Sequence, residues 1–181
     1  MALDYKRLKI PHLVLIQPKI LRDERGFFVE KYKQSDFEEI GIPLFKQDNY
    51  SSSKKGVIRG LHYQLPPHDQ GKLVSVVKGS IWDVAVDIKK SSKSFGQWVG
   101  VELNEKNNLS FYIPPGFAHG FSVLSGLAHV LYKCTTEYSA PHERGLRFDD
   151  HNLNIDWKID NPVLSPKDTE WPGIKEIETF E

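Results

Sequence analysis

The sequence predicts an all-β protein built as an antiparallel sandwich or barrel. Roughly nine short runs rich in branched and aromatic residues follow one another at near-regular spacing. Turn-forming Gly, Pro, Asn and Ser residues separate these runs, and a single short segment has the pattern of a helix. Many short strands joined by tight turns are typical of sandwiches and barrels.

The composition limits the number of domains and the kinds of partner. A chain of 181 residues is long enough for one well-buried core and short for two, so a single domain over residues 1–181 is expected. The 24 Lys and Arg balance the 24 Asp and Glu, so no net field attracts nucleic acid or an anionic membrane. The single Cys134 cannot form an internal disulfide, and the apolar run at residues 13–16 is too short for a signal or membrane segment. These features predict a soluble, cytoplasmic protein.

Two strands are expected near the N-terminus. Residues 12–18 form a short apolar run, and residues 27–32 alternate between two faces, one of which combines Glu30 with two aromatic residues. The polar residues 21–26 between them predict a turn.

The one expected helix follows these strands. Ser35 with Glu38 three residues later has the form of a capping box, and Gly41 marks the end of the helix. Residues 44–50 resume strand character, and the polar residues 51–55 predict a turn.

The central part of the chain places three cationic or titratable side chains within strand-like apolar runs. Arg59, His62 and Lys72 lie among branched residues on either side of a Pro-Pro loop. Burying a charge is unfavourable unless a partner compensates it, so these residues indicate an anionic ligand. The alternative is structural, with both cations paired to carboxylates of the next strand and His62 packed as an ordinary core histidine. Asp83 and Asp87 are the candidate carboxylates.

The next strand, at residues 81–88, has two different faces. Trp82 belongs to a wholly apolar face, whereas the other face mixes Asp83 and Asp87 with apolar residues and indicates a wet interior or rim. Further strands are expected at residues 98–103, 109–113, 121–124 and 127–135, followed by loops from residue 138 onward.

His62, Lys72 and Tyr132 form the first set of residues with catalytic potential. A histidine can take a carbon-bound proton near neutral pH, and a lysine ammonium can stabilise the enolate oxygen that results. A tyrosine can then donate a proton to the opposite face of the planar enolate. This set suits proton abstraction next to a carbonyl, but sequence separation alone does not place Tyr132 beside His62.

The residues alone leave other kinds of site open. Several histidines and an acid such as Glu30 would have to converge to bind a metal, but the chain lacks the His-x-His pair that puts two imidazoles on one strand face, so no metal is expected. The histidines concerned are His62, His68, His119 and His129.

Anion capture and stacking are further alternatives. Tyr138 and several Phe side chains can stack on a nucleobase or a sugar face. The serines at residues 51–53 lack a nearby histidine-acid pattern, which argues against serine-type hydrolysis. The cations at turns that suit a phosphate are Arg25, Arg59, Arg144 and Lys167.

Several segments, in order over nearly the whole chain, carry a resemblance to a known family. They are DERGFFVE (23–30), FKQDNYSSS (45–53), GVIRGLHYQLPP (56–67), QGKLVSVVKG (70–79), DVAVDIKKSS (83–92), IPPGFAHGF (113–121), YKCTTEYSAPHERGL (132–146) and LSPKD (164–168). They resemble the dTDP-4-dehydrorhamnose 3,5-epimerase family. The resemblance implies a cupin-type β jelly roll, a homodimer that exchanges N-terminal strands, and no metal or other cofactor.

The same resemblance implies roles for individual residues. His62 is implied as the general base, oriented by Asp168. Tyr132 is implied as the acid on the opposite face of the sugar, and Lys72 as the group that stabilises the enolate oxygen. The implied substrate contacts are Arg25 and Arg59 at the diphosphate and sugar, Tyr138 against thymine, and Glu30, Gln47, Asn49, His119, Glu143 and Lys167 around the pocket.

The implied reaction inverts C3 and C5 of dTDP-4-keto-6-deoxy-D-glucose and gives dTDP-4-keto-L-rhamnose for deoxysugar biosynthesis. Each inversion removes a proton next to the C4 ketone and returns one from the opposite side. The alternatives are inversion of a single carbon, ketoisomerisation, or binding of the same sugar nucleotide without turnover.

This assignment also predicts an irregular strand. Arg59 and His62 are an odd number of residues apart, so a regular strand would direct them to opposite faces, yet both are assigned to one pocket. Gly60 lies between them and can adopt the backbone angles that a bulge requires. We therefore expect the strand to be irregular at Gly60.

Overall fold

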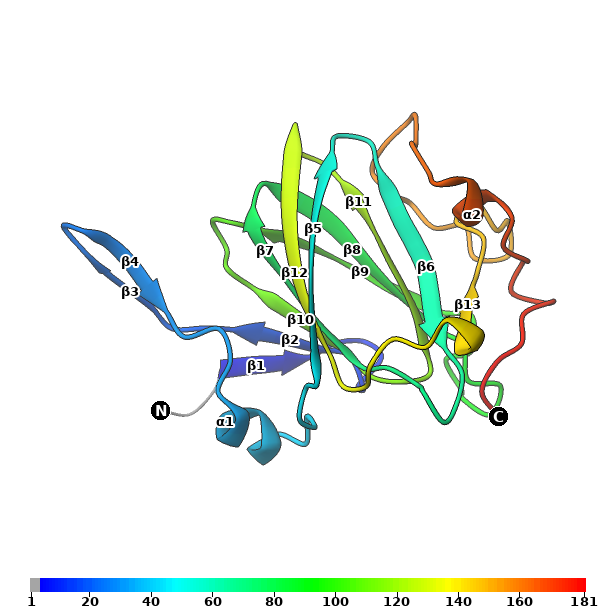
Figure 1. The fold of residues 1–181 in the computed structure, drawn as a ribbon, viewed down its shortest axis with the longest axis horizontal. Helices are drawn as coiled ribbons and strands as arrows, with labels where there is room; N and C mark the ends of the chain where they lie inside the picture. Colours follow the sequence, from blue (N-terminus) through cyan, green and yellow to red (C-terminus); the bar gives the residue numbers. More distant parts are fainter. Residues whose placement is uncertain (1–3) are drawn as a thin grey trace.

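Two antiparallel β-sheets pack face to face in the computed structural model, which describes residues 4–181 (Figure 1). The first sheet has the order β1 (Asp4–Arg7), β2 (Val14–Gln17), β10 (Ser110–Ile113), β7 (Lys72–Lys78), β12 (Leu127–Cys134) and β5 (Gln47–Lys54). The second has the order β13 (Glu143–Gly145), β6 (Ile58–Gln64), β11 (Phe117–Val123), β8 (Ser80–Asp87) and β9 (Trp98–Asn104). The strands of both sheets pair antiparallel, which confirms the expected all-β jelly roll.

A separate hairpin and short helices complete the elements. β3 (Ile20–Asp23) pairs with β4 (Gly26–Val29) in a ribbon that extends away from the sandwich (Figure 1). α1 (Gln34–Glu39) follows it, a 3-10 helix spans Ala140–His142, and α2 (Pro166–Thr169) lies near the C-terminus. Among residues 4–181, no helix is both long enough and apolar enough to cross a membrane.

The main core lies between the two sheets because strand side chains alternate between inward and outward directions. Val74 and Val130 of the first sheet and Ile81 and Phe121 of the second belong to this cluster. A second apolar cluster covers the outer face of the second sheet, where C-terminal residues such as Trp157 pack. The second sheet is therefore buried on both faces, which explains why β8 is almost continuously buried.

Two of the expected turns are largely strand. The turn expected at residues 51–55 is wrong, because β5 continues to Lys54 and pairs along its length with β12. Pairing with a neighbour overrides the weak strand preference of the three serines. The turn expected at residues 21–26 shrinks to Glu24 and Arg25, which join the two strands of the hairpin.

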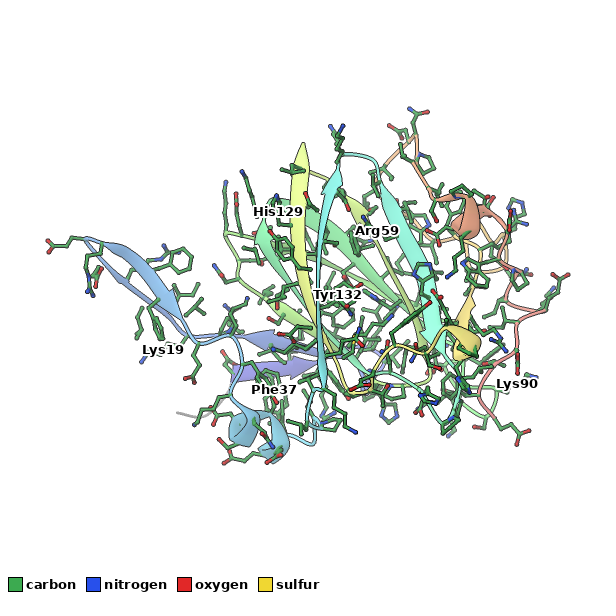
Figure 2. All side chains as sticks on the ribbon, viewed as in Figure 1. Lys19, Phe37, Arg59, Lys90, His129 and Tyr132 are labelled. Carbon is green, nitrogen blue, oxygen red and sulfur yellow. The ribbon has the colours of Figure 1, made fainter. Side chains whose placement is uncertain are left out.

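The helix α1 forms where expected but not for the expected reason. Its N-cap is Lys33 rather than Ser35, and no side chain caps it, so the predicted capping box is wrong. Phe37 is 2% exposed and packs on the outer face of the first sheet (Figure 2). Tertiary burial of one aromatic face, rather than a cap, stabilises this short helix. Gly41 follows the helix with a φ of +84°, as expected for a helix end.

β6 carries the irregularity that the sequence predicts. His62 pairs with His119 of β11, and Arg59 pairs with Phe121, so three steps along β6 match two steps along β11. Gly60 lies within this bulge with a φ of +120°, a conformation that residues with a side chain rarely adopt. Because of the extra residue, Arg59 and His62 point to the same face of the sheet, and both line the same cavity.

Gly120 of β11 allows the bulge to form. A Cβ atom on Gly60 would lie 2.5 Å from the Cα atom of Gly120, and one on Gly120 would lie 2.7 Å from the carbonyl oxygen of Arg59. The two backbones therefore approach more closely than any side chain permits.

Replacing Gly120 with Ala should destabilise the protein. The added methyl group must displace backbone atoms of Arg59 and Gly60, and overpacking of this kind costs about 1–3 kcal/mol of unfolding free energy. Chemical denaturation of both proteins measures the difference. Gly126→Ala is the matched control because a Cβ atom there meets nothing within 4 Å. An equal loss in the two variants would contradict the close-contact explanation.

Candidate active site

A cavity of about 370 Å³ lies between the two sheets. Its walls come from β6 and β11 of the second sheet, from β7 and β12 of the first, and from the segment that leads into α2. Arg59 and Tyr132, both labelled in Figure 2, face it from opposite sheets. The predicted site residues in its wall are Arg59, His62, Lys72, His119, Tyr132, Lys167 and Asp168.

A second cavity of about 170 Å³ adjoins the first. His62, Lys72 and Tyr132 line both cavities. The other predicted site residues in the second cavity are Gln47, Asn49, Tyr138 and Glu143. The three side chains with catalytic potential therefore stand where the two cavities meet, with room for an extended ligand on either side.

His62 is held by a carboxylate from the C-terminal segment. Its Nε2 atom lies 2.5 Å from Oδ1 of Asp168. Asp168 lies in the first turn of α2, and its backbone N–H donates to the hydroxyl of the N-cap residue Ser165. Burial alone would raise the pKa of Asp168, but the hydrogen bond from His62 holds it below its usual value. An ionised Asp168 accepts the Nε2 proton, which leaves Nδ1 as the basic atom of the neutral ring.

Lys72 brings a positive charge into the wall between the cavities. Its ammonium lies 3.4 Å from the carbonyl oxygen of His62. Burial lowers the pKa of Lys72, and the neighbouring groups Cys134, Asp83 and Glu143 oppose this shift. A negatively charged substrate oxygen placed here would likewise raise the pKa of Lys72 and favour its charged form.

Tyr132 supplies a proton donor from the opposite sheet. Burial raises the pKa of its phenol, and the positive charge of Arg59 opposes this shift only in part. The phenol therefore stays protonated at neutral pH and can donate a proton into the cavity.

Arg59 and Lys72 are not paired with carboxylates of the next strand, as the structural alternative requires. Asp83 is fully buried, and its two oxygens lie 3.0 and 3.1 Å from Nε2 of His119. Asp87 instead accepts hydrogen bonds from two serine hydroxyls in the loop after β8. Within residues 4–181, neither carboxylate forms an ion pair with Arg59 or Lys72. These cations are consequently available to a ligand.

Glu143 connects Tyr138 of the second cavity with Lys167 of the first. Its Oε2 atom lies 2.5 Å from Nζ of Lys167 and accepts a hydrogen bond of 2.6 Å from the Tyr138 hydroxyl. Gln47 accepts the backbone N–H of Tyr138 at 2.8 Å and donates to Asn49 at 3.0 Å. Tyr138 is 56% exposed, so its ring face is free to stack on a planar ligand.

Comparison with known proteins identifies the family of the chain. A family model for dTDP-4-dehydrorhamnose 3,5-epimerase matches residues 7–176. The chain belongs to this epimerase family. It is 52% identical over 164 residues to the dTDP-4-dehydrorhamnose 3,5-epimerase of Shigella flexneri, a match that covers 90% of this chain and 91% of that protein.

Two further epimerases are similar over almost their whole length. The enzyme of the same name from Pseudomonas aeruginosa is 48% identical over 177 residues, which cover 96% of this chain and 97% of that one. A crystal structure of the 3,5-epimerase from Legionella pneumophila Philadelphia 1, in complex with dTDP-4-keto-L-rhamnose, superposes with a TM-score of 0.94 at 48% identity. That match covers 97% of this chain and 95% of the other.

Two substrate contacts that the family resemblance implies lie outside both cavities. Arg25 is at the turn of the β3–β4 hairpin, where it pairs with Asp23 at 2.5 Å, and Glu30 follows the hairpin directly. The hairpin extends away from the sandwich (Figure 1). One chain on its own therefore does not bring Arg25 and Glu30 close to His62.

The histidines considered as metal ligands do not converge. His68 packs against His142 with the ring centroids 4.3 Å apart, and His129 bonds the Tyr50 hydroxyl. Neither lines the cavity that holds His62. In the described part of the chain, no group of three or more His, Cys, Asp or Glu side chains is placed to hold a metal ion.

The sequence does not predict site roles for three residues near the cavities, and it offers Asp83 only as an ion-pair partner for the cations. Asp83 has a signal, since an acid in an apolar strand indicates a wet interior, but nothing local links it to His119. Ser165 before a proline has the form of a helix N-cap. Trp171, which contacts the ring of His62, has no local signal.

Proposed function

We propose that this protein inverts both C3 and C5 of dTDP-4-keto-6-deoxy-D-glucose and produces dTDP-4-keto-L-rhamnose. The observation that carries the proposal is that His62 and Tyr132 lie on opposite walls of one cavity. His62 comes from β6 in the second sheet, and Tyr132 comes from β12 in the first. Inversion of a carbon requires a proton to leave one face and another to arrive at the opposite face, so a base and an acid on facing walls fit the reaction.

His62 removes the proton from the carbon next to the C4 ketone. Asp168 holds the Nε2–H, so Nδ1 takes the proton and the carboxylate stabilises the imidazolium that forms. The electron pair of the broken C–H bond moves into an enolate and places negative charge on the C4 oxygen. The ammonium of Lys72 stabilises this oxygen.

Tyr132 returns a proton from the other face. The new C–H bond forms with inverted configuration and the enolate reverts to the ketone. Solvent then returns a proton to the tyrosinate of Tyr132 and takes the extra proton from the imidazolium of His62. Each inversion breaks one C–H bond and forms another. The proposed cycle moves protons only and uses no metal or cofactor.

The remaining contacts divide between the parts of the sugar nucleotide. Arg59 is exposed at the cavity and suits the diphosphate, whereas the exposed ring of Tyr138 suits the thymine base. The other predicted contacts that line the two cavities surround the sugar and the linkage, and they are Gln47, Asn49, His119, Glu143 and Lys167. A cytoplasmic location is part of this proposal, and the free thiol of Cys134 is in keeping with a reducing compartment.

Deuterium incorporation tests the proposed reaction. The protein is incubated with dTDP-4-keto-6-deoxy-D-glucose in D₂O, with and without EDTA, and C3 and C5 are followed by NMR. We expect label at both carbons under both conditions. Label at C3 alone would indicate a single-carbon epimerase, and binding without any label would indicate a non-catalytic protein.

Two variants separate the two proton transfers. His62→Ala removes the base and should lower labelling at both carbons by about 10²- to 10⁴-fold. Tyr132→Phe should slow inversion while exchange through His62 persists. Circular dichroism establishes that both variants are folded. Wild-type labelling rates in His62→Ala would contradict the role of His62.

The rate should fall on the alkaline side at a pH below the ordinary lysine pKa of about 10.4. Burial lowers the pKa of Lys72, and loss of its proton removes the charge that stabilises the enolate. Tyr132 does not explain such a fall, because burial raises its pKa. Lys72→Arg keeps its charge throughout this range and should lose the alkaline fall, even with a lower rate near neutrality. The same alkaline limb in both proteins would contradict this assignment.

We infer that the active unit is a homodimer in which the β3–β4 hairpin reaches the cavity of the partner. β5 is an edge strand of the first sheet and carries Gln47 and Asn49 of the second cavity. A hairpin from a second copy placed beside β5 would bring Arg25 and Glu30 to the site and cover apolar surface. The large apolar side chains exposed on the hairpin are Leu21 at 46%, Phe27 at 54% and Phe28 at 66%.

Co-expression of two inactive variants tests this arrangement. A mixed dimer of Arg25→Ala and His62→Ala has one complete site if Arg25 acts on the partner, so activity should recover to about a quarter of wild type with random pairing. His62→Ala with Tyr132→Phe is the control, because both residues line the cavity of the same chain and no mixed dimer is complete. Recovery in neither pair would place Arg25 in its own chain's site.

A further inference from the structure

Trp171 lies beside the proposed base without lining either cavity. Its indole meets the ring of His62 edge to face, with the ring centroids 6.4 Å apart and the planes at 70°. It follows Asp168 by three residues, so one short segment supplies both the carboxylate on Nε2 and the aromatic wall beside the ring. His62 is thus contacted by the same segment from two directions.

Gly145 provides the space in which the indole sits. It is the β13 residue that pairs with His62 in the second sheet. A Cβ atom on Gly145 would lie 2.2 Å from Cδ2 and Cε2 of Trp171. The indole therefore occupies the position that a side chain next to His62 would otherwise take.

Lys167 covers the indole, with its Nζ atom 5.4 Å from the ring centroid. The indole N–H of Trp171 is buried and close enough to Asp168 to act on its carboxylate. Burial would raise the pKa of Asp168, whereas His62 first, and then Ser165 and Trp171, lower it.

Trp82 offers an internal comparison. It sits on Gly100, where a Cβ atom would lie 2.3 Å from its ring, and Nζ of Lys158 lies 5.6 Å from its centroid. Its indole N–H is buried as well. A tryptophan seated on a glycine and covered by a lysine is therefore a packing arrangement that the chain uses away from the site. What distinguishes Trp171 is its contact with His62.

We propose that Trp171 is a positioning residue that fixes the orientation of the His62 imidazole. It keeps Nε2 on Asp168 and Nδ1 directed to the carbon-bound proton by blocking rotation of the ring. This inference rests on the proposed function, in which His62 is the base. Misplacing a catalytic group by about 1 Å can cost roughly 10²-fold in rate, so the indole contributes to kcat rather than to substrate affinity.

Trp171→Ala should lower kcat by roughly 10- to 100-fold, as is typical when a residue that orients a site group is removed. KM should stay within a few-fold, because Trp171 lines neither cavity. Trp171→Phe keeps a ring against His62 and should restore kcat to within a few-fold of wild type. Trp82→Ala is the matched control, since it loses the same kind of packing and should leave kcat unchanged. Rates are expressed per folded protein, with the folded fraction taken from thermal denaturation.

Gly145→Ala gives an independent test that remains decisive if Trp171→Ala fails to fold. The added methyl group should displace the indole and lower kcat on its own. In combination with Trp171→Ala it should cause little further loss, because the ring that it displaces is already gone.

Wild-type turnover, measured first, separates this inference from the proposed function, which fails if the wild type does not label either carbon. With an active wild type, unchanged kcat in Trp171→Ala or in Gly145→Ala would overturn the positioning role. A loss in Trp82→Ala equal to that in Trp171→Ala, or additive losses in the double variant, would do the same. A kcat loss confined to Trp171→Ala and Gly145→Ala, and restored in Trp171→Phe, supports it.

Discussion

The contact between the backbones of Gly60 and Gly120 sets the geometry on which the site depends. It permits one extra residue in β6, and this residue changes which side chains share a face. Ile58 and Leu61 both join the apolar cluster outside the second sheet, although they are an odd number of residues apart. Their neighbours Arg59 and His62 consequently both reach the cavity. The bulge thus lets Ile58 and Leu61 face the outer apolar cluster while Arg59 and His62 face the cavity, which a regular strand cannot do.

Burial then adjusts the chemistry of the residues that the bulge brings together. The same desolvation that keeps the phenol of Tyr132 protonated makes the ammonium of Lys72 easier to deprotonate. Asp83 and Glu143 act against the second effect without forming an ion pair with Lys72. An ammonium without a direct ion-pair partner is well suited to stabilise negative charge that appears only during the reaction.

Period-two alternation predicts most of the sandwich, because strands buried on one face must repeat every second residue. The conflict between that parity and the roles of Arg59 and His62 predicts the bulge at Gly60. Residues 51–55 escape prediction since their strand character comes from pairing with β12, not from their own preferences. The bond between His62 and Asp168 joins residues 106 positions apart, so it follows from the family resemblance and not from any local pattern. Neither a local sequence pattern nor the family resemblance indicates Trp171.

The two proton-transfer residues are held by the sheets, whereas the group that orients the base is not. Tyr132 pairs with Asn49 on one side and Val74 on the other, and His62 pairs with His119 and Gly145. Ladders on both sides fix these two backbones on facing walls, as inversion of a carbon requires. Asp168 lies in the short helix α2 and Trp171 follows it, and this C-terminal segment is outside both sheets. The rotation of the His62 ring, which no strand pairing controls, is therefore left to that segment, and a contact there can change the rate while the walls stay in place.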